Sequence, residues 1–191
     1  MTSWKALLLT AALCGVAAPA WPQSSSPGKG VHYVILIRHG AYVPDKTTDD
    51  RVADGLNPLG HEQARAAGAR LAKLPIKIDA LVSSDFTRAR ESADDIGRAL
   101  RMEATRDSLI HECRPDSDRP DTSSAARLEV TACEADLAAA WEKYFQPTPA
   151  ADRHDVLVCH GNVIRWMVAR ALGVDTKRWS RMDIANASLT V

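Results

Sequence analysis

Apolar runs alternate with amphipathic stretches along most of the chain after residue 30. Val31–Ile37 (VHYVILI) is almost entirely apolar and rich in β-branched residues, which indicates a strand buried on both faces. The shorter runs Ile78–Ser83 (IDALVS) and Asp155–Cys159 (DVLVC) predict two more strands of this kind. Brief strands are also expected near Thr105 and over Ala187–Val191 (ASLTV).

Helical periodicity fills the gap after each of the first two long strands. Asn57-Pro58 has the pattern of an N-cap followed by proline in the first turn, and the helix it opens ends at Pro75. The second helix begins after Ser84 or Asp85, either of which would cap it, and runs to Leu100. The apolar face of the first helix is formed by Ala64, Ala67, Leu71 and Leu74.

Two further helices are predicted in the second half of the chain, after an irregular stretch from Arg101 to Ser124. Ala125–Phe145 has helical spacing, and Val163–Leu172 forms an apolar helix that Asn162 would cap and Gly173 would close. The core candidates on the first of these are Leu128, Leu137, Trp141 and Tyr144.

Strands that alternate with helices predict an α/β fold, with a mostly parallel sheet and helices on both faces. A chain of 191 residues with 46% apolar content is expected to form one such domain around a sizeable core. In these sheets ligands bind beyond the carboxyl ends of the strands.

The formal charge is balanced, with 24 Lys and Arg residues against 24 Asp and Glu residues. No strongly basic run stands out, so the sequence gives no indication of a nucleic-acid partner.

The first thirty residues have the character of a targeting segment and a tether. Lys5, the apolar run Ala6–Ala18 and the sequence Ala18-Pro19-Ala20 predict a signal peptide over residues 1–20. Residues 21–30 (WPQSSSPGKG) predict a flexible linker, which leaves residues 31–191 for the domain. We therefore expect an exported, periplasmic protein, and the alternative is a membrane tether formed by an uncleaved N-terminal segment.

Three cysteines remain after the predicted signal, at positions 113, 133 and 159. No CxxC spacing occurs, so a structural zinc site has no support. A bridge between Cys113 and Cys133 and a set of three free thiols are both compatible with an exported chain.

Two of the predicted buried strands end in the same way. ILIRHG places His39 just past the first strand, and LVCHGN places His160 just past the strand Asp155–Cys159. If these strands are parallel neighbours, the two imidazoles emerge on the same rim of the sheet. A glycine after each histidine allows a sharp turn and the close approach of a ligand.

Arginine completes this candidate site. Arg38 precedes His39, and Arg88 lies about one turn into the helix that follows Ser83, so both are expected at the same rim. Guanidinium groups bind phosphoryl oxygens through paired hydrogen bonds, and this combination predicts a phosphate pocket. Arg165, on the helix after His160, either braces this pocket or forms a surface salt bridge.

Four blocks in this order make the resemblance specific: IRHG, NPLGHEQA (57–64), SSDFTRARESA (83–93) and VCHGNVIRWMVARAL (158–172). The chain resembles the phosphoglycerate mutase-like histidine phosphatases over nearly all of residues 31–191. The aspartate-rich loop after RHG, HECRPDSDRP and GVDTKRWSRMDIANASLT place it near the branch of the mitochondrial serine/threonine protein phosphatases of this superfamily. The resemblance implies a phosphoglycerate mutase-like fold.

The resemblance also implies a role for each site residue. His39 would be the nucleophile that accepts the phosphoryl group, and Arg38, Arg88 and His160 would bind its oxygens. Glu112 would be the general acid, with Asp107, Asp116 and Asp118 as rivals for that role. We expect a neutral His39 among positively charged neighbours, and no cofactor or metal, because the arginines neutralise the phosphate.

The sequence departs from true mutases, which usually carry an asparagine a few residues after RHG. Tyr42-Val43-Pro44-Asp45 stands there instead, which favours hydrolysis over transfer. Many relatives also have a terminal hairpin and tail beyond the position of Val191. The resulting hypothesis is a phosphomonoester hydrolase acting on a phosphoprotein or a small phosphoester.

Three alternatives remain open from the sequence. One is a periplasmic phosphatase of an envelope sugar such as a heptose, and another is a phosphohistidine phosphatase. The third belongs to a different class, a phospho-ligand binding module without catalysis.

Overall fold

The computed structural model describes residues 30–119 and 127–191, apart from positions 46, 48, 50 and 53. The predicted signal peptide and nearly all of the predicted linker lie outside the described residues. Within the part that is described, no helix is both long enough and apolar enough to cross a bilayer.

A five-stranded sheet forms the centre of the molecule, with strand order β3-β2-β4-β1-β5. Its strands are β1 (His32–Arg38), β2 (Ala80–Ser83), β3 (Thr105–Arg106), β4 (Arg153–Cys159) and β5 (Leu189–Thr190). All pairings are parallel except that of β5, which runs antiparallel to β1. The predicted α/β architecture with a mostly parallel sheet is confirmed.

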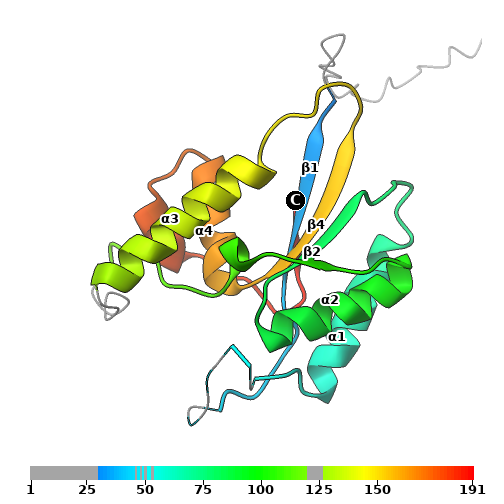
Figure 1. The fold of residues 1–191 in the computed structure, drawn as a ribbon, viewed down its shortest axis with the longest axis horizontal. Helices are drawn as coiled ribbons and strands as arrows, with labels where there is room; N and C mark the ends of the chain where they lie inside the picture. The colour runs from blue at the N-terminus through cyan, green and yellow to red at the C-terminus, as the bar shows by residue number, and fades with distance from the viewer. Residues whose placement is uncertain (1–29, 46, 48, 50, 53, 120–126) are drawn as a thin grey trace, which may run out of the picture.

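Helices cover both faces of this sheet, as Figure 1 shows. α1 (Pro58–Leu71) and α2 (Thr87–Leu100) lie together on one face, and α3 (Arg127–Tyr144) and α4 (Gly161–Ala171) lie on the other. The short 3-10 helices η1 (Ser108–Ile110) and η3 (Thr176–Arg181) complete the described elements.

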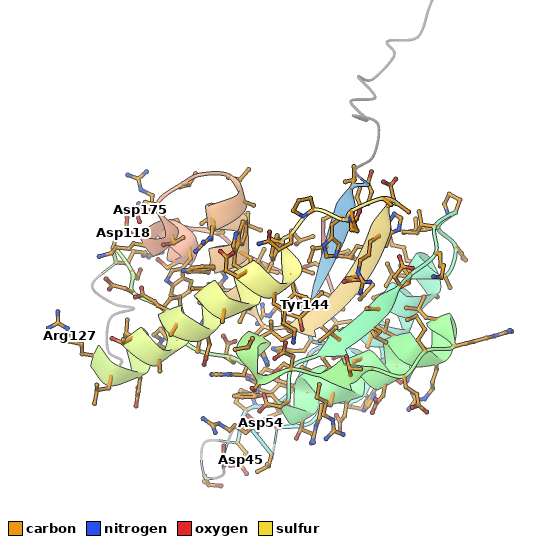
Figure 2. The ribbon with its side chains drawn as sticks, turned by 45° about the horizontal axis from the view of Figure 1, so that its top comes forward. Asp45, Asp54, Asp118, Arg127, Tyr144 and Asp175 are labelled. Atoms are coloured by element: carbon orange, nitrogen blue, oxygen red, sulfur yellow. A yellow bond between two sulfur atoms is a disulfide. The ribbon has the colours of Figure 1, made fainter. Side chains whose placement is uncertain are left out.

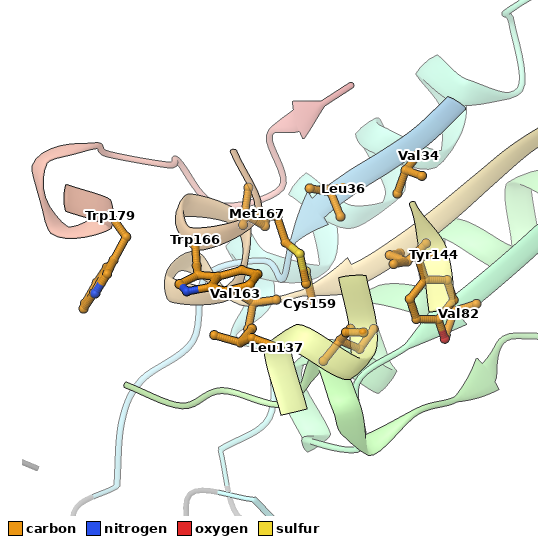
Figure 3. Close-up of a cluster of buried hydrophobic side chains, with 14 of the residues drawn as sticks. Val34, Leu36, Val82, Leu137, Tyr144, Cys159, Val163, Trp166, Met167 and Trp179 are labelled. Atoms are coloured by element: carbon orange, nitrogen blue, oxygen red, sulfur yellow. The ribbon is translucent and has the colours of Figure 1, made fainter. Parts of the chain in front are cut away.

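Strands β1 and β4 are apolar over Val34–Ile37 and Val156–Cys159 because each of these runs contributes to two cores. Ile35 and Ile37 of β1 pack with Val156 and Val158 of β4 against α1 and α2. The alternate residues of both strands face α3 and α4, since successive side chains of a strand point to opposite faces. Figure 3 shows this second core, which includes Val34, Leu36, Leu137, Tyr144, Cys159, Val163, Trp166 and Met167.

Several local predictions about the helices need correction. Asn57 does cap α1, with its side chain accepting a hydrogen bond from the amide of Gly60. Neither Ser84 nor Asp85 caps α2, whose N-cap position is Phe86, and Asn162 lies inside α4 instead of capping it. α2 begins later than predicted and α4 begins earlier, and the side chains of Ser84 and Asn162 bond His160 and Cys113 instead.

Two residues predicted to be in the core lie at the surface. Leu74 falls beyond the end of α1 and is 40% exposed, and Leu128 in the first turn of α3 is 84% exposed. Leu74 lies past the last turn of α1, and Leu128 is the second residue of α3, so each is at an end of its helical pattern.

A disulfide joins Cys113 to Cys133, which settles the alternative left open by the sequence. The bridge ties the irregular segment after η1 to α3. Cys159 remains a free thiol at the end of β4, where it is fully buried, and burial raises the pKa of that thiol.

Candidate active site

His39 and His160 lie side by side at the carboxyl ends of β1 and β4. These strands pair in parallel, with Arg38 opposite Cys159, and the amide of His39 donates to the carbonyl of Cys159 at 3.0 Å. The two imidazole ring centroids are 5.2 Å apart, and both side chains are almost completely buried. The predicted convergence of the two histidines is confirmed.

The ring of His39 is held in one orientation and one tautomer. Its Nδ1 lies 2.8 Å from the carbonyl oxygen of Gly40, which only accepts hydrogen bonds, so the ring hydrogen is on Nδ1. This leaves the lone pair of Nε2 available. Burial, followed by the charges of Arg88 and Arg38, lowers the pKa of His39 to about 3, although the bond to Gly40 acts in the opposite direction. The imidazole is therefore neutral at physiological pH.

The segment after His39 is fixed by side chains from three distant elements. Ser92 of α2 accepts from the amide of Gly40 at 2.9 Å, and Gln63 of α1 accepts from the amide of Ala41 at 2.8 Å. Asn186 donates to the carbonyl of His39 at 2.9 Å. Gly40 itself cannot be replaced without movement, because a Cβ there would lie 2.3 Å from the carbonyl oxygen of Gly60.

Further along, the loop between β1 and α1 folds around one buried carboxylate. Asp54 is 3% exposed and accepts from the amide of Asp45 at 2.8 Å, and Figure 2 shows both aspartates in this loop. This loop also carries Tyr42, whose ring stands edge-on to His39 with centroids 5.2 Å apart.

His160 is held by Ser84, at the end of β2. The Ser84 hydroxyl lies 2.8 Å from His160 Nε2 and accepts from the amide of Phe86 at 3.3 Å. We infer that the hydroxyl hydrogen points to Nε2, in which case the ring hydrogen is on Nδ1. Burial, together with the neighbouring charges of His39 and Arg88, lowers the pKa of His160 well below its usual value. This direction favours a neutral His160, whereas the positive charge expected around His39 is carried by Arg38 and Arg88.

Both predicted arginines reach the pair of histidines. Arg88 is only 1% exposed, and its guanidinium lies over the rings of Tyr42 and Phe86, at 4.7 and 4.9 Å from their centroids. Arg38 donates from Nη1 to the carbonyl of Ile184 at 2.5 Å, while its Nε is buried without a hydrogen-bond partner in the described chain. The charges of both guanidinium groups therefore act on both buried imidazoles.

Glu112 lies next to His160 and belongs to the segment after η1. Its Oε2 lies 3.9 Å from His160 Nδ1. The next residue, Cys113, is fixed twice, by its disulfide to Cys133 and by the side-chain amide of Asn162, which donates to its carbonyl at 3.0 Å. Glu112 also lines a cavity of roughly 320 Å³ that opens between this segment and α3.

The three rival carboxylates are bonded to structural partners. Asp107 accepts from Lys143 at 2.7 Å and from the hydroxyl of Tyr144 at 2.5 Å. Burial raises its pKa, but these hydrogen bonds outweigh that effect and keep the pKa below its usual value. Asp107 thus links η1 to α3 and is not aimed at the histidines.

The other two rivals pair with η3. Asp116 lies 2.8 Å from Lys177, and Asp118 accepts hydrogen bonds from both Nε and Nη2 of Arg181. These hydrogen bonds lower the pKa of each carboxyl. Figure 2 shows Asp118 beside Asp175, in the region of η3. Among the four candidates, only Glu112 is placed with the histidines.

Three residues of the site were not predicted as site residues from the sequence: Tyr42, Ser84 and Phe86. Ser84 follows the end of a buried strand, just as His39 and His160 do, and that position was a usable signal. Tyr42 and Phe86 flank Arg88 from two separate loops, and nothing in either local pattern indicates that contact.

The model of the histidine phosphatase superfamily (branch 1) matches residues 34–116 and 126–191 of this chain. The chain therefore belongs to the histidine phosphatase superfamily.

The similar proteins include "Serine/threonine-protein phosphatase PGAM5, mitochondrial" of Xenopus tropicalis. That relative is 34% identical over 177 residues, which cover 85% of this chain and 59% of the relative. The chain thus spans about three-fifths of the length of this relative.

Solved structures share the fold. A Plasmodium falciparum phosphoglycerate mutase aligns with a TM-score of 0.56 at 24% identity, over 80% of this chain and 76% of that chain. A mycobacterial glucosyl-3-phosphoglycerate phosphatase in complex with inorganic phosphate aligns with a TM-score of 0.59 at 24% identity, over 82% and 86% of the two chains. The phosphoglycerate mutase-like architecture expected from the sequence is confirmed.

Proposed function

We propose that this protein is a phosphomonoester hydrolase that works through a phosphohistidine at His39. The observation that carries the proposal is the imidazole of His39, which is held by Gly40 through Nδ1, lies beside the ring of His160 and is close enough to Arg88 and Arg38 for their charges to act on it. A nucleophile must keep its lone pair, and phosphoryl transfer needs positive charge and hydrogen-bond donors around the equatorial oxygens. This arrangement meets both needs, and the arginines supply the charge.

In the first step, His39 Nε2 attacks phosphorus and the bond from phosphorus to the leaving oxygen breaks. Glu112 gives its proton to that oxygen as general acid. The phosphorylated ring then carries its hydrogen on Nδ1, where the carbonyl of Gly40 stabilises it. Nδ1 of His160 and the two guanidinium groups donate to the phosphoryl oxygens.

In the second step, water attacks the phosphorus of phospho-His39. Glu112, now a carboxylate, takes a proton from the water, and the bond between phosphorus and Nε2 breaks. Inorganic phosphate leaves, and the enzyme returns to its starting protonation state. The fixed position of the segment next to Glu112 serves both steps, because the same carboxyl acts twice.

A phosphoprotein or a small phosphoester is the proposed substrate. The similarity to protein phosphatases that are 34% identical favours a phosphoprotein. The proposed export favours instead a small periplasmic phosphoester, such as a phosphorylated envelope sugar. Phosphohistidine is a third candidate, since the fold is shared with a putative phosphohistidine phosphatase from Agrobacterium tumefaciens.

We also propose that residues 1–20 direct export, on the strength of their charge and apolar pattern. A fusion of residues 1–30 to a periplasm-dependent alkaline phosphatase reporter tests this proposal. Reporter activity in intact cells is expected, and its absence would contradict export. Replacing the apolar run Ala6–Ala18 with a polar linker provides the matched control.

Hydrolysis of p-nitrophenyl phosphate by residues 31–191, with and without a chelator, tests the proposed activity. We expect turnover that chelation does not change and that His39→Ala lowers by at least about a thousandfold. Phosphate binding without turnover would support the binding module instead. A screen of phosphopeptides, sugar phosphates and phosphohistidine then assigns the substrate class.

A further inference from the structure

Arg165 lies at the rim of the candidate site, although it belongs to the second turn of α4. Side chains of a helix tilt toward its N-terminus, which carries the guanidinium back to the level of Gly161. A Cβ on Gly161 would lie 3.2 Å from Arg165 Nη2 and 3.5 Å from Arg38 Nε. The two guanidinium groups therefore lie against the same glycine.

Arg165 has almost no partner of its own in the part of the chain that the structure describes. Its Nε is buried without a hydrogen bond, and no carboxylate there lies within 4.0 Å of its guanidinium. Its described contact is with the ring of Trp179, at 5.6 Å. The surface salt bridge expected from the sequence is wrong, because no described acidic side chain pairs with it.

Arg170, on the same helix, shows what a structural arginine looks like here. It lies 3.6 Å from Glu142 and stacks on Trp141 and Trp166, at 5.0 and 5.3 Å. The charge of Arg170 is thus paired with a carboxylate, whereas the charge of Arg165 has no such partner among the described residues.

Two like charges against one glycine repel each other, and a partly buried guanidinium without acceptors is unfavourable. An anion between them would relieve both costs. His160 Nδ1 is fully buried at the start of α4, and it too lacks a hydrogen-bond partner in the described chain. The unused donors of Arg38, Arg165 and His160 thus gather at the N-terminus of α4, where the helix dipole also favours negative charge.

We propose that Arg165 is a substrate-binding residue, which together with Arg38 binds an anionic oxygen of the substrate. The proposal rests on the phosphatase function proposed above and extends it. The oxygen belongs either to the phosphoryl group that is transferred or to a second anionic group beside it, such as a carboxylate. Both sources offer the oxyanion that two guanidinium groups bind.

Arg165→Gln and Arg170→Gln form a matched pair for the test, since each removes one arginine from the same helix. Isothermal titration of inorganic phosphate into each variant measures binding without any need for turnover. Phosphate is expected to bind Arg165→Gln about 10- to 100-fold more weakly than the wild type if Arg165 contacts the transferred group. Arg170→Gln is expected to bind it as the wild type does.

A second experiment tests whether Arg165 binds a second anionic group of the substrate instead of the transferred phosphoryl group. Two phosphoserine peptides that differ only in an aspartate beside the phosphoserine are titrated into His39→Ala variants with and without Arg165→Gln. Loss of the preference for the acidic peptide, with unchanged phosphate affinity, would assign Arg165 to the second anionic group. If Arg165→Gln matches Arg170→Gln with both probes, the proposal is overturned.

The test of Arg165 can succeed or fail independently of the test of the proposed hydrolase activity. A wild-type protein that binds phosphate through Arg165 but never hydrolyses a phosphoester would contradict the hydrolase and leave this proposal supported. Arg165→Lys gives a further check, because a retained charge without the planar fork should restore part of the affinity.

Discussion

Ser84 and His160 are joined by a hydrogen bond of 2.8 Å that is completely buried. The Ser84 oxygen accepts from the amide of Phe86, and we infer that its own hydrogen points to His160 Nε2. The Nδ1 that carries the hydrogen in this tautomer lies 3.9 Å from Glu112 Oε2. We infer that Ser84, a residue of the SSDFTRARESA block, favours the tautomer of His160 with the hydrogen on Nδ1.

Replacing Ser84 with alanine should allow the ring hydrogen of His160 to move between Nδ1 and Nε2. We expect Ser84→Ala to lower kcat/KM for an aryl phosphate by about 10- to 100-fold, in line with the loss of one well-placed donor. Ser84→Thr keeps the hydroxyl and should retain most of the activity. Nitrogen-15 NMR of the imidazoles is the direct measurement, with a protonated Nδ1 expected for His160 in the wild type. A protonated Nε2 there would contradict the assignment.

Replacing each carboxylate with the corresponding amide distinguishes Glu112 from Asp107 as the general acid. Glu112→Gln should lower kcat by about 100- to 10,000-fold, since it removes the proton donor, and the loss should shrink for substrates with more acidic leaving groups. Asp107→Asn should leave kcat within a few-fold while it lowers the melting temperature, because Asp107 bonds Lys143 and Tyr144. A leaving-group series for both variants makes the comparison. The reverse pattern would transfer the general acid to Asp107.

The disulfide between Cys113 and Cys133 should support both stability and activity. It closes a segment with a sequence separation of 20 residues, and a bridge of that size contributes about 3 kcal/mol in the chain-entropy model. We expect a Cys113→Ser, Cys133→Ser variant to melt at a lower temperature and to show lower kcat, because Cys113 adjoins Glu112. Dithiothreitol should act on the wild type in the same way and leave the serine variant unchanged. An unchanged kcat in the variant would show that the bridge does not position Glu112.

The buried histidines predict a pH-dependent stability. His39 and His160 have pKa values below the usual value in the folded protein, so the unfolded chain binds more protons once the pH falls below about 6.5. Their contribution is therefore fully present above that pH and is lost as the pH falls toward the folded pKa of His39, about 3. Each contributes a slope of at most about 1.4 kcal/mol per pH unit.

Urea unfolding from pH 7.5 to pH 4.5 checks this dependence. The wild type should lose more stability over the range than His39→Gln, whose side chain does not titrate. Equal losses in the two proteins would mean that His39 is not held neutral by its surroundings.

Much of the fold, and the proximity of Arg38, His39, Arg88 and His160, could be predicted from sequence for a physical reason. Val34–Ile37 and Val156–Cys159 are buried on both faces, so their apolar runs are unbroken and their ends are easy to locate. A histidine and a glycine at such an end stand out against the run. Parallel pairing then determines that both histidines share one rim.

The remaining features depend on contacts between segments that no local pattern records. Glu112 lies in an irregular segment, and its place follows from a disulfide and from Asn162, not from periodicity. Ser84 was expected to cap a helix, but its hydroxyl is used by His160. The charge of His160 depends on its complete burial, which the sequence alone does not specify.

The central claim is a covalent bond between phosphorus and Nε2 of His39. Rapid alkaline quenching of the protein during turnover of an aryl phosphate, followed by peptide mass spectrometry, measures that bond directly. We predict a phosphoryl group on the peptide that contains His39, stable in base and lost in acid, and absent from His39→Ala. Turnover without any such adduct, in a protein whose Glu112→Gln variant also fails to accumulate it, would contradict the account.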